Sequence, residues 1–71
     1  MERGQVIIAK FGWNDITKRP FEFKYEFGYY VDYGAVVYKE GESNFQDSAL
    51  FKLGEIRLAT EEDKENYYWA I

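Results

Sequence analysis

The sequence predicts a β-rich α+β fold, in which a small curved antiparallel sheet or open SH3-like barrel of four to five strands precedes a short C-terminal α-helix. Residues 21–27 alternate aromatic and charged side chains without interruption, as a half-buried strand does. Residues 60–63 have the composition of a helix start. The chain of 71 residues has room for one hydrophobic core, so we expect a single domain, residues 1–71.

Aromatic residues are the expected material of that core. The chain has no cysteine, so neither a disulfide nor a thiolate metal site can stabilise so small a domain. Phe, Tyr and Trp make up 21% of the residues, and each ring can bury roughly 150–250 Å². We therefore expect aromatic packing to supply most of the stability.

Five strands are expected, separated by turn residues. Their predicted ranges are residues 5–11, 20–31, 35–39, 49–53 and 55–58. The only proline, Pro20, fits the first residue of the second strand. Residues 32–34 are predicted to form a three-residue hairpin loop with Gly34 in the left-handed conformation, and the alternative is a turn at residues 27–28. Gly54 suits a bulge or a corner where the sheet bends.

The second predicted strand has one aromatic face and one charged face. The rings at positions 21, 23, 25 and 27 share one side, and the charged residues between them share the other. We expect all four rings to turn inward as the core, with the charged face toward solvent. The alternative is an exposed platform for single-stranded nucleic acid, because Lys18, Arg19 and Lys24 lie nearby and each stacked base would contribute ~1–3 kcal/mol.

A helix is expected over residues 61–70. Thr60 can cap its free N–H groups, and Asp63 stands at the reciprocal position of a capping box. A helix this short is not stable alone in water, so it must pack on the sheet. Trp69 points away from the other apolar side chains of the predicted helix. Either the last turn unwinds and buries the indole, or the indole is offered to a partner.

The net charge of −4 is unevenly distributed. Residues 1–27 hold five basic and four acidic groups, whereas residues 28–71 hold four basic and nine acidic groups. Such a field repels a phosphate backbone and attracts a basic protein surface. We expect a protein partner with a basic surface, rather than nucleic acid or a membrane, and self-association through an edge strand is a further option. The absence of cysteine, of N-x-[ST] acceptors and of an apolar leader predicts a cytoplasmic protein.

Residue types that carry catalysis are scarce. The chain has no histidine and no cysteine, which removes the commonest general base, the commonest zinc ligands and every Ser-His or Cys-His nucleophile pair. Its six glycines stand singly, so no phosphate-binding loop is present. The acidic residues of the predicted helix start lack the spacing of a Ca²⁺ loop. We expect no enzyme activity, no cofactor and no metal.

The function predicted from these features is a small acidic protein–protein interaction module. One concrete form is an inhibitor encoded by a phage or another mobile element, which covers a basic surface of a host protein. The alternatives are a small barrel that binds single-stranded nucleic acid through an aromatic face, and a structural or scaffold subunit that oligomerises. The expected partner-binding residues are Trp69, Trp13, Tyr30, Tyr33, Glu61, Glu62, Asp63 and Glu65.

Overall fold

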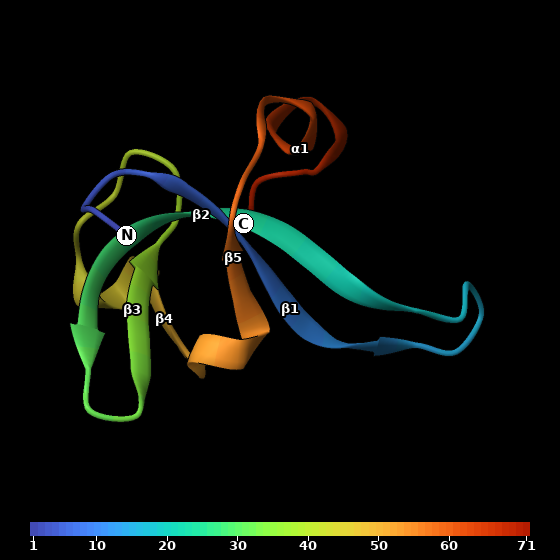
Figure 1. Cartoon of the computed structure of the whole chain (residues 1–71), viewed down its shortest axis with the longest axis horizontal. Coiled ribbons are helices and arrows are strands. Elements are labelled where there is room, and N and C mark those ends of the chain that lie inside the picture. Colours follow the sequence, from blue (N-terminus) through green and yellow to red (C-terminus); the bar gives the residue numbers. More distant parts are fainter.

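A computed structural model describes residues 1–71 and shows a five-stranded antiparallel sheet that does not close, with a short C-terminal helix (Figure 1). The predicted fold class is confirmed. The elements are β1 (Val6–Asn14), β2 (Arg19–Val31), β3 (Gly34–Tyr38), the 3₁₀ turn η1 (Phe45–Asp47), β4 (Ser48–Phe51), the 3₁₀ turn η2 (Leu53–Glu55), β5 (Ile56–Leu58) and α1 (Glu61–Asn66). The strands lie in the order β4-β3-β2-β1-β5. No helix has the length and apolar character needed to cross a membrane.

The β1–β2 hairpin is much longer than the strands beside it. β3 pairs with β2 only over Glu26–Val31, and β5 pairs with β1 only over Ile7–Ala9. Residues 10–22 therefore project as an arm in which β1 and β2 have only each other as strand neighbours (Figure 1). A bulge between Lys10 and Trp13, with Gly12 at φ +83°, bends the arm.

The core lies on one face of the sheet. Its buried side chains are Ile7, Ala9, Tyr25, Phe27, Ala35, Val37 and Phe51. Phe23 packs against this cluster but is only half-buried, and Phe21 is 42% exposed. The expectation that all four rings of β2 turn inward is therefore wrong for Phe21. The reason is that Phe21 lies on the arm, beyond the reach of β3 and β4, so no second layer covers it.

The start of α1 agrees with the sequence, but its end does not. Thr60 Oγ1 accepts from the Asp63 N–H at 3.0 Å and Asp63 Oδ2 accepts from the Thr60 N–H at 2.8 Å, which is the predicted capping box. The helix ends at Asn66, four residues before the predicted residue 70, and Tyr67 is extended at φ −113° and ψ 147°. We call residues 67–71 the C-terminal segment.

Backbone pairing with β2 explains why the helix stops. The Lys24 N–H donates to the Tyr68 carbonyl at 2.8 Å, and the Ala70 N–H donates to the Lys24 carbonyl at 3.0 Å. These two bonds make a parallel bridge between Lys24 and Trp69. Of the two alternatives for Trp69, the structure shows the first: the last predicted turn unwinds, and the indole is half-buried.

Of the two glycines with predicted roles, Gly54 lies at a corner as predicted, whereas Gly34 has a different role. The β2–β3 turn contains two residues, Asp32 and Tyr33. Gly34 is the first residue of β3, and its φ is not positive. Gly34 is required for closeness, because a Cβ there would collide with the carbonyl oxygen of Phe51 in β4. Gly54 lies in η2, at the corner between β4 and β5.

Candidate functional site

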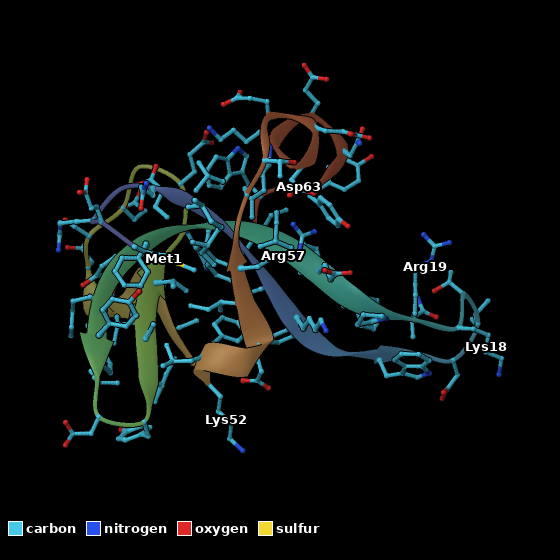
Figure 2. The ribbon with its side chains drawn as sticks, in the orientation of Figure 1. Met1, Lys18, Arg19, Lys52, Arg57 and Asp63 are labelled. Atoms are coloured by element: carbon cyan, nitrogen blue, oxygen red, sulfur yellow. The ribbon has the colours of Figure 1, made fainter.

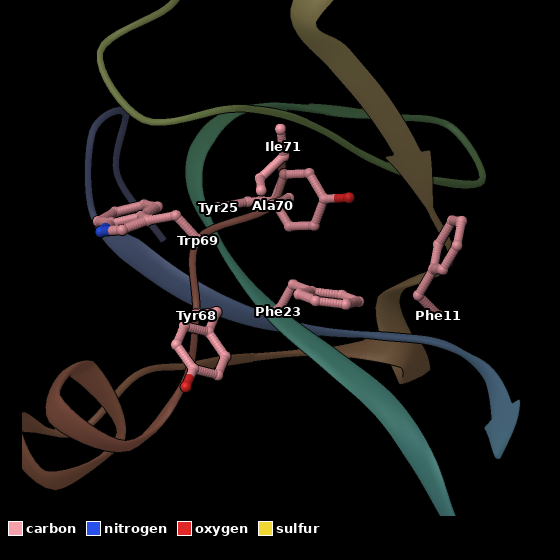
Figure 3. A pocket seen from close by; sticks show the side chains of 7 residues that line it. All are labelled: Phe11, Phe23, Tyr25, Tyr68, Trp69, Ala70 and Ile71. Atoms are coloured by element: carbon pink, nitrogen blue, oxygen red, sulfur yellow. The ribbon is translucent and has the colours of Figure 1, made fainter.

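An apolar groove opens on the core face of the sheet, with a volume of about 730 Å³ (Figure 3). It is lined by seven apolar residues: Phe11, Phe23, Tyr25, Tyr68, Trp69, Ala70 and Ile71. Phe23 and Tyr25 of β2 contribute to its floor, and the C-terminal segment contributes one wall (Figure 3). Phe11 of β1 stands on the opposite side (Figure 3). We refer to this site as the apolar groove.

Contacts among aromatic rings connect the groove to the core. The Phe11 and Tyr25 rings each make a T-shaped contact with the Phe51 ring, at centroid distances of 6.4 Å and 5.4 Å respectively. Burial raises the pKa of the Tyr25 phenol above its ordinary value of 10.0, because the phenolate would lose hydration. The rim is open to water: Phe11 is 58% exposed and Tyr68 is 82% exposed. The groove therefore offers rings for contact, and none of its lining side chains is an acid or a base of the Asp, Glu, Lys, Arg or His type.

A buried lysine holds the wall of the groove in place. Lys24 is 9% exposed, its Nζ donates to the Lys64 carbonyl at 2.6 Å, and it lies 4.9 Å from the centroid of the Trp69 ring. The Lys24 ammonium makes no salt bridge to a carboxylate within 4.0 Å. The Lys24 ammonium loses hydration on burial, and the Lys64 carbonyl and the face of the Trp69 ring offset that loss. The residue fixes the C-terminal segment by side chain as well as by backbone.

The acidic residues of α1 divide into structural and free groups. Arg57 donates to both carboxylate oxygens of Asp63, with Nη2 3.2 Å from Oδ1, below α1 (Figure 2). The hydrogen bond from Arg57 and the bond from the Thr60 N–H hold the Asp63 pKa well below its ordinary value of 3.8. The same bond raises the Arg57 pKa. Asp63 is therefore part of the fold and is not free for a partner.

The other three acids of α1 are exposed to solvent. Glu61 receives a hydrogen bond from Lys64 Nζ at 3.1 Å, a surface pair of small energetic value. Glu62 and Glu65 make no salt bridge. No group of three or more His, Cys, Asp or Glu side chains is placed to hold a metal ion. The free charge of α1 is available to a partner as a field rather than as a coordination site.

The remaining predicted site residues do not share a surface with the groove. Trp13 is exposed on the arm, and Tyr33 is exposed in the β2–β3 turn. These two hairpin ends project in different directions, and α1 lies on a third side (Figure 1). Tyr30 is half exposed and packs its ring on Phe27, with centroids 4.8 Å apart. Of the eight predicted residues, only Trp69 lines the apolar groove.

A smaller hollow continues the apolar groove along the arm. It shares Phe23 and Tyr68 with the groove. Its other lining residues are Asn14, Thr17, Arg19, Pro20, Phe21, Glu22 and Tyr67. A separate apolar hollow, lined in part by Tyr29, Leu50 and the exposed Phe45, lies over β3 and β4. The first two hollows form one continuous surface along β2, and the third does not belong to it.

No protein-family model, no curated protein and no solved structure matches the chain. Its function therefore has to be argued from the groove, the arm and the charges themselves.

Proposed function

We propose that the chain is a non-enzymatic protein-binding module, in which the apolar groove receives apolar side chains of a partner and the acids of α1 favour a basic partner surface. The observation that carries the proposal is the groove: seven apolar side chains line a hollow that is open to water. Exposed aromatic clusters of this kind are typical of protein interfaces, where a rigid ring loses little conformational entropy on binding.

The chemistry of the groove supports binding rather than catalysis. The side chains that line it carry only two phenols and one indole as polar groups. Tyr25 is protonated near neutral pH, because its ordinary pKa of 10.0 is far above 7 and burial raises the pKa further. The lining side chains include no carboxylate, amine or imidazole, so they offer no acid–base pair for proton transfer.

Electrostatics support a basic partner. The exposed acids Glu61, Glu62 and Glu65 stand on the helix that leads directly into the groove wall. They would increase the association rate with a Lys- or Arg-rich surface, with strong dependence on salt. An inhibitor from a phage or another mobile element, which covers a basic surface of a host protein, is the concrete form of this proposal.

Affinity capture with matched variants tests the proposal. The wild-type protein is compared with Tyr68→Ser, which removes the most exposed ring of the groove, and with a triple Glu61, Glu62 and Glu65→Gln variant. Phe45→Ser is the control, because Phe45 is 92% exposed but lies in the separate hollow over β3 and β4. We expect a saturable partner that is lost with Tyr68→Ser, weakened at low salt by the Gln variant and retained by the control. Absence of any saturable partner, or equal loss with the control, would contradict the proposal.

A second candidate, binding of single-stranded nucleic acid, is supported by Phe21 and Phe11. Both rings are exposed, and Arg19 lines the same hollow as Phe21. Lys18 and Arg19 stand at the end of the arm, far from Asp63 (Figure 2). Stacking of bases on these rings would quench the fluorescence of Trp13, and the effect would weaken as salt rises. Titration with oligothymidylate that produces no quenching at low salt would remove this candidate.

A further inference from the structure

The arm has unpaired backbone groups at Glu22. In an antiparallel pair, alternate residues direct N–H and C=O toward the partner strand and away from it. Lys24 directs its N–H and C=O away from β1, because both bond the C-terminal segment. Glu22, two residues earlier, must point the same way. No backbone group bonds it there, since β3 begins its pairing at Glu26 and the C-terminal segment bridges only Lys24.

We propose that an extended segment of the partner adds as a strand along this open edge of β2, with alternating apolar and basic side chains. The inference rests on the proposed protein-binding function and names the kind of partner. Strand addition to an exposed sheet edge takes affinity from main-chain hydrogen bonds and specificity from alternate side chains. The edge offers the N–H and C=O of Glu22 and the C=O of Pro20, whose missing N–H limits the pairing to a short stretch.

The alternation follows from the two faces of β2. One set of side chains from an added strand would lie on the groove face, next to Phe21, Phe23 and Tyr68. This face requires apolar residues. The other set would lie on the opposite face, which carries the Glu22 carboxylate and is the side toward α1, as the contact of Lys24 with Lys64 shows.

Charge complementarity selects basic residues for that second set. The side toward α1 carries three acids without a salt bridge, Glu22, Glu62 and Glu65. Its cations Lys24, Arg57 and Lys64 are occupied by the Lys64 carbonyl, Asp63 and Glu61, which leaves Lys10, opposite Glu22 on β1, as the one cation without such a partner. Lysine or arginine side chains on an added strand would meet a surface of opposite sign. Acidic residues at the same positions would be repelled.

Selection from a displayed library of random peptides tests the inference without a known partner. The protein is used as wild type, Glu22→Ala and Glu22→Pro. The first variant keeps the edge N–H, and the second removes it at a strand edge where proline is sterically tolerated. We expect enrichment of peptides that alternate apolar residues with Lys or Arg. Their affinity should fall about tenfold or more for Glu22→Pro relative to Glu22→Ala, since one main-chain bond is lost.

A second measurement protects the test against misfolding of the proline variant. The enriched peptides are synthesised with single N-methyl groups along the backbone and titrated against the wild-type protein. Strand addition predicts that N-methylation weakens binding about tenfold at one or two positions on the hydrogen-bonded side and has little effect at alternate positions. It also predicts chemical-shift changes at the Glu22 amide.

Four results would overturn the inference: no enriched peptide, enriched peptides without alternation, no sensitivity to N-methylation, or self-association of the protein through the same edge. The proposed function fails separately. If affinity capture finds a partner that depends on Tyr68 but binds Glu22→Pro and Glu22→Ala equally, the protein-binding function stands and strand addition at Glu22 is wrong.

Discussion

Replacement of Lys24 by leucine should release the C-terminal segment from β2. The Lys24 side chain is 9% exposed, and its Nζ lies 4.9 Å from the Trp69 ring centroid. Cation–π contacts contribute about 0.5–1 kcal/mol when exposed and about 2 kcal/mol when desolvated, so this pair belongs in the upper part of that range. We expect a coupling free energy of about 1–2 kcal/mol between Lys24→Leu and Trp69→Leu in a double-mutant cycle.

Hydrogen exchange at Ala70 is the assay for this coupling. The Ala70 N–H donates to the Lys24 carbonyl at 3.0 Å, so its exchange rate reports how often the C-terminal segment detaches. Lys24→Leu alone should accelerate the exchange by about tenfold, because a factor of ten corresponds to about 1.4 kcal/mol. Lys10→Leu is the control. Lys10 is an exposed residue of β1 on the same face of the sheet as Lys24, and it makes no cation–π contact with a ring. A coupling below about 0.3 kcal/mol would refute the role of Lys24.

Three further predictions concern the fold. Gly34→Ala should lower the free energy of unfolding by about 1–3 kcal/mol in urea, because its Cβ collides with the Phe51 carbonyl, whereas Gly54→Ala has open space and should change it by less than about 0.5 kcal/mol. The pKa of Asp63 is lowered in the folded state, so wild type should be more stable than Asp63→Asn by its full difference above pH 3.8. This difference should decline as the pH falls below 3.8 toward the folded-state pKa, and urea midpoints of both proteins measured down to about pH 2 check the decline. Tyr25 has a raised pKa, so its contribution is complete below pH 10.0 and declines as the pH rises through the folded-state value. Urea midpoints should therefore fall less on the alkaline side for Tyr25→Phe.

Local patterns were sufficient to predict the fold class. Strict alternation over residues 21–27 identified β2, and the capping pattern of Thr60 and Asp63 identified the first residue of α1. These signals depend on residues close together in the chain. The end of α1 depends instead on Lys24, more than 40 positions away, whose open backbone groups bind the C-terminal segment. Helix periodicity contains no information about such a competitor.

The same limit explains two errors about the faces of β2. Alternation placed Lys24 on a solvent-facing side of β2, yet α1 and Trp69 cover it. Phe21 was expected in the core, but it lies on an arm that no other strand accompanies. Both outcomes depend on the unequal lengths of neighbouring strands, 13 residues in β2 against 5 in β3. Turn residues in the sequence show where a strand ends. They do not show which part of a longer neighbouring strand it will pair with.

The predicted partner-binding set combines rings expected to be exposed with acids of the helix start, and the structure places its members on several surfaces. Trp13 and Tyr33 are exposed, but they stand at different hairpin ends. Phe11, Phe23 and Tyr68, which line the groove, were not in that set. A signal for Tyr68 existed in the dense aromatic cluster next to Trp69, but the assumed helix directed the two side chains apart. In the structure both residues line the groove, Tyr68 as an exposed ring and Trp69 as a half-buried one.

Residues 67–71 leave the helix and form one wall of the apolar groove against β2, and the proposed function depends on this arrangement. A nuclear Overhauser spectrum of the wild-type protein, recorded with amide exchange, tests it most directly. We expect contacts between the Trp69 ring and the Lys24 side chain, together with slow exchange of the Lys24 and Ala70 amides. Helical contacts from Asn66 to Ala70, with fast exchange at Lys24, would contradict it.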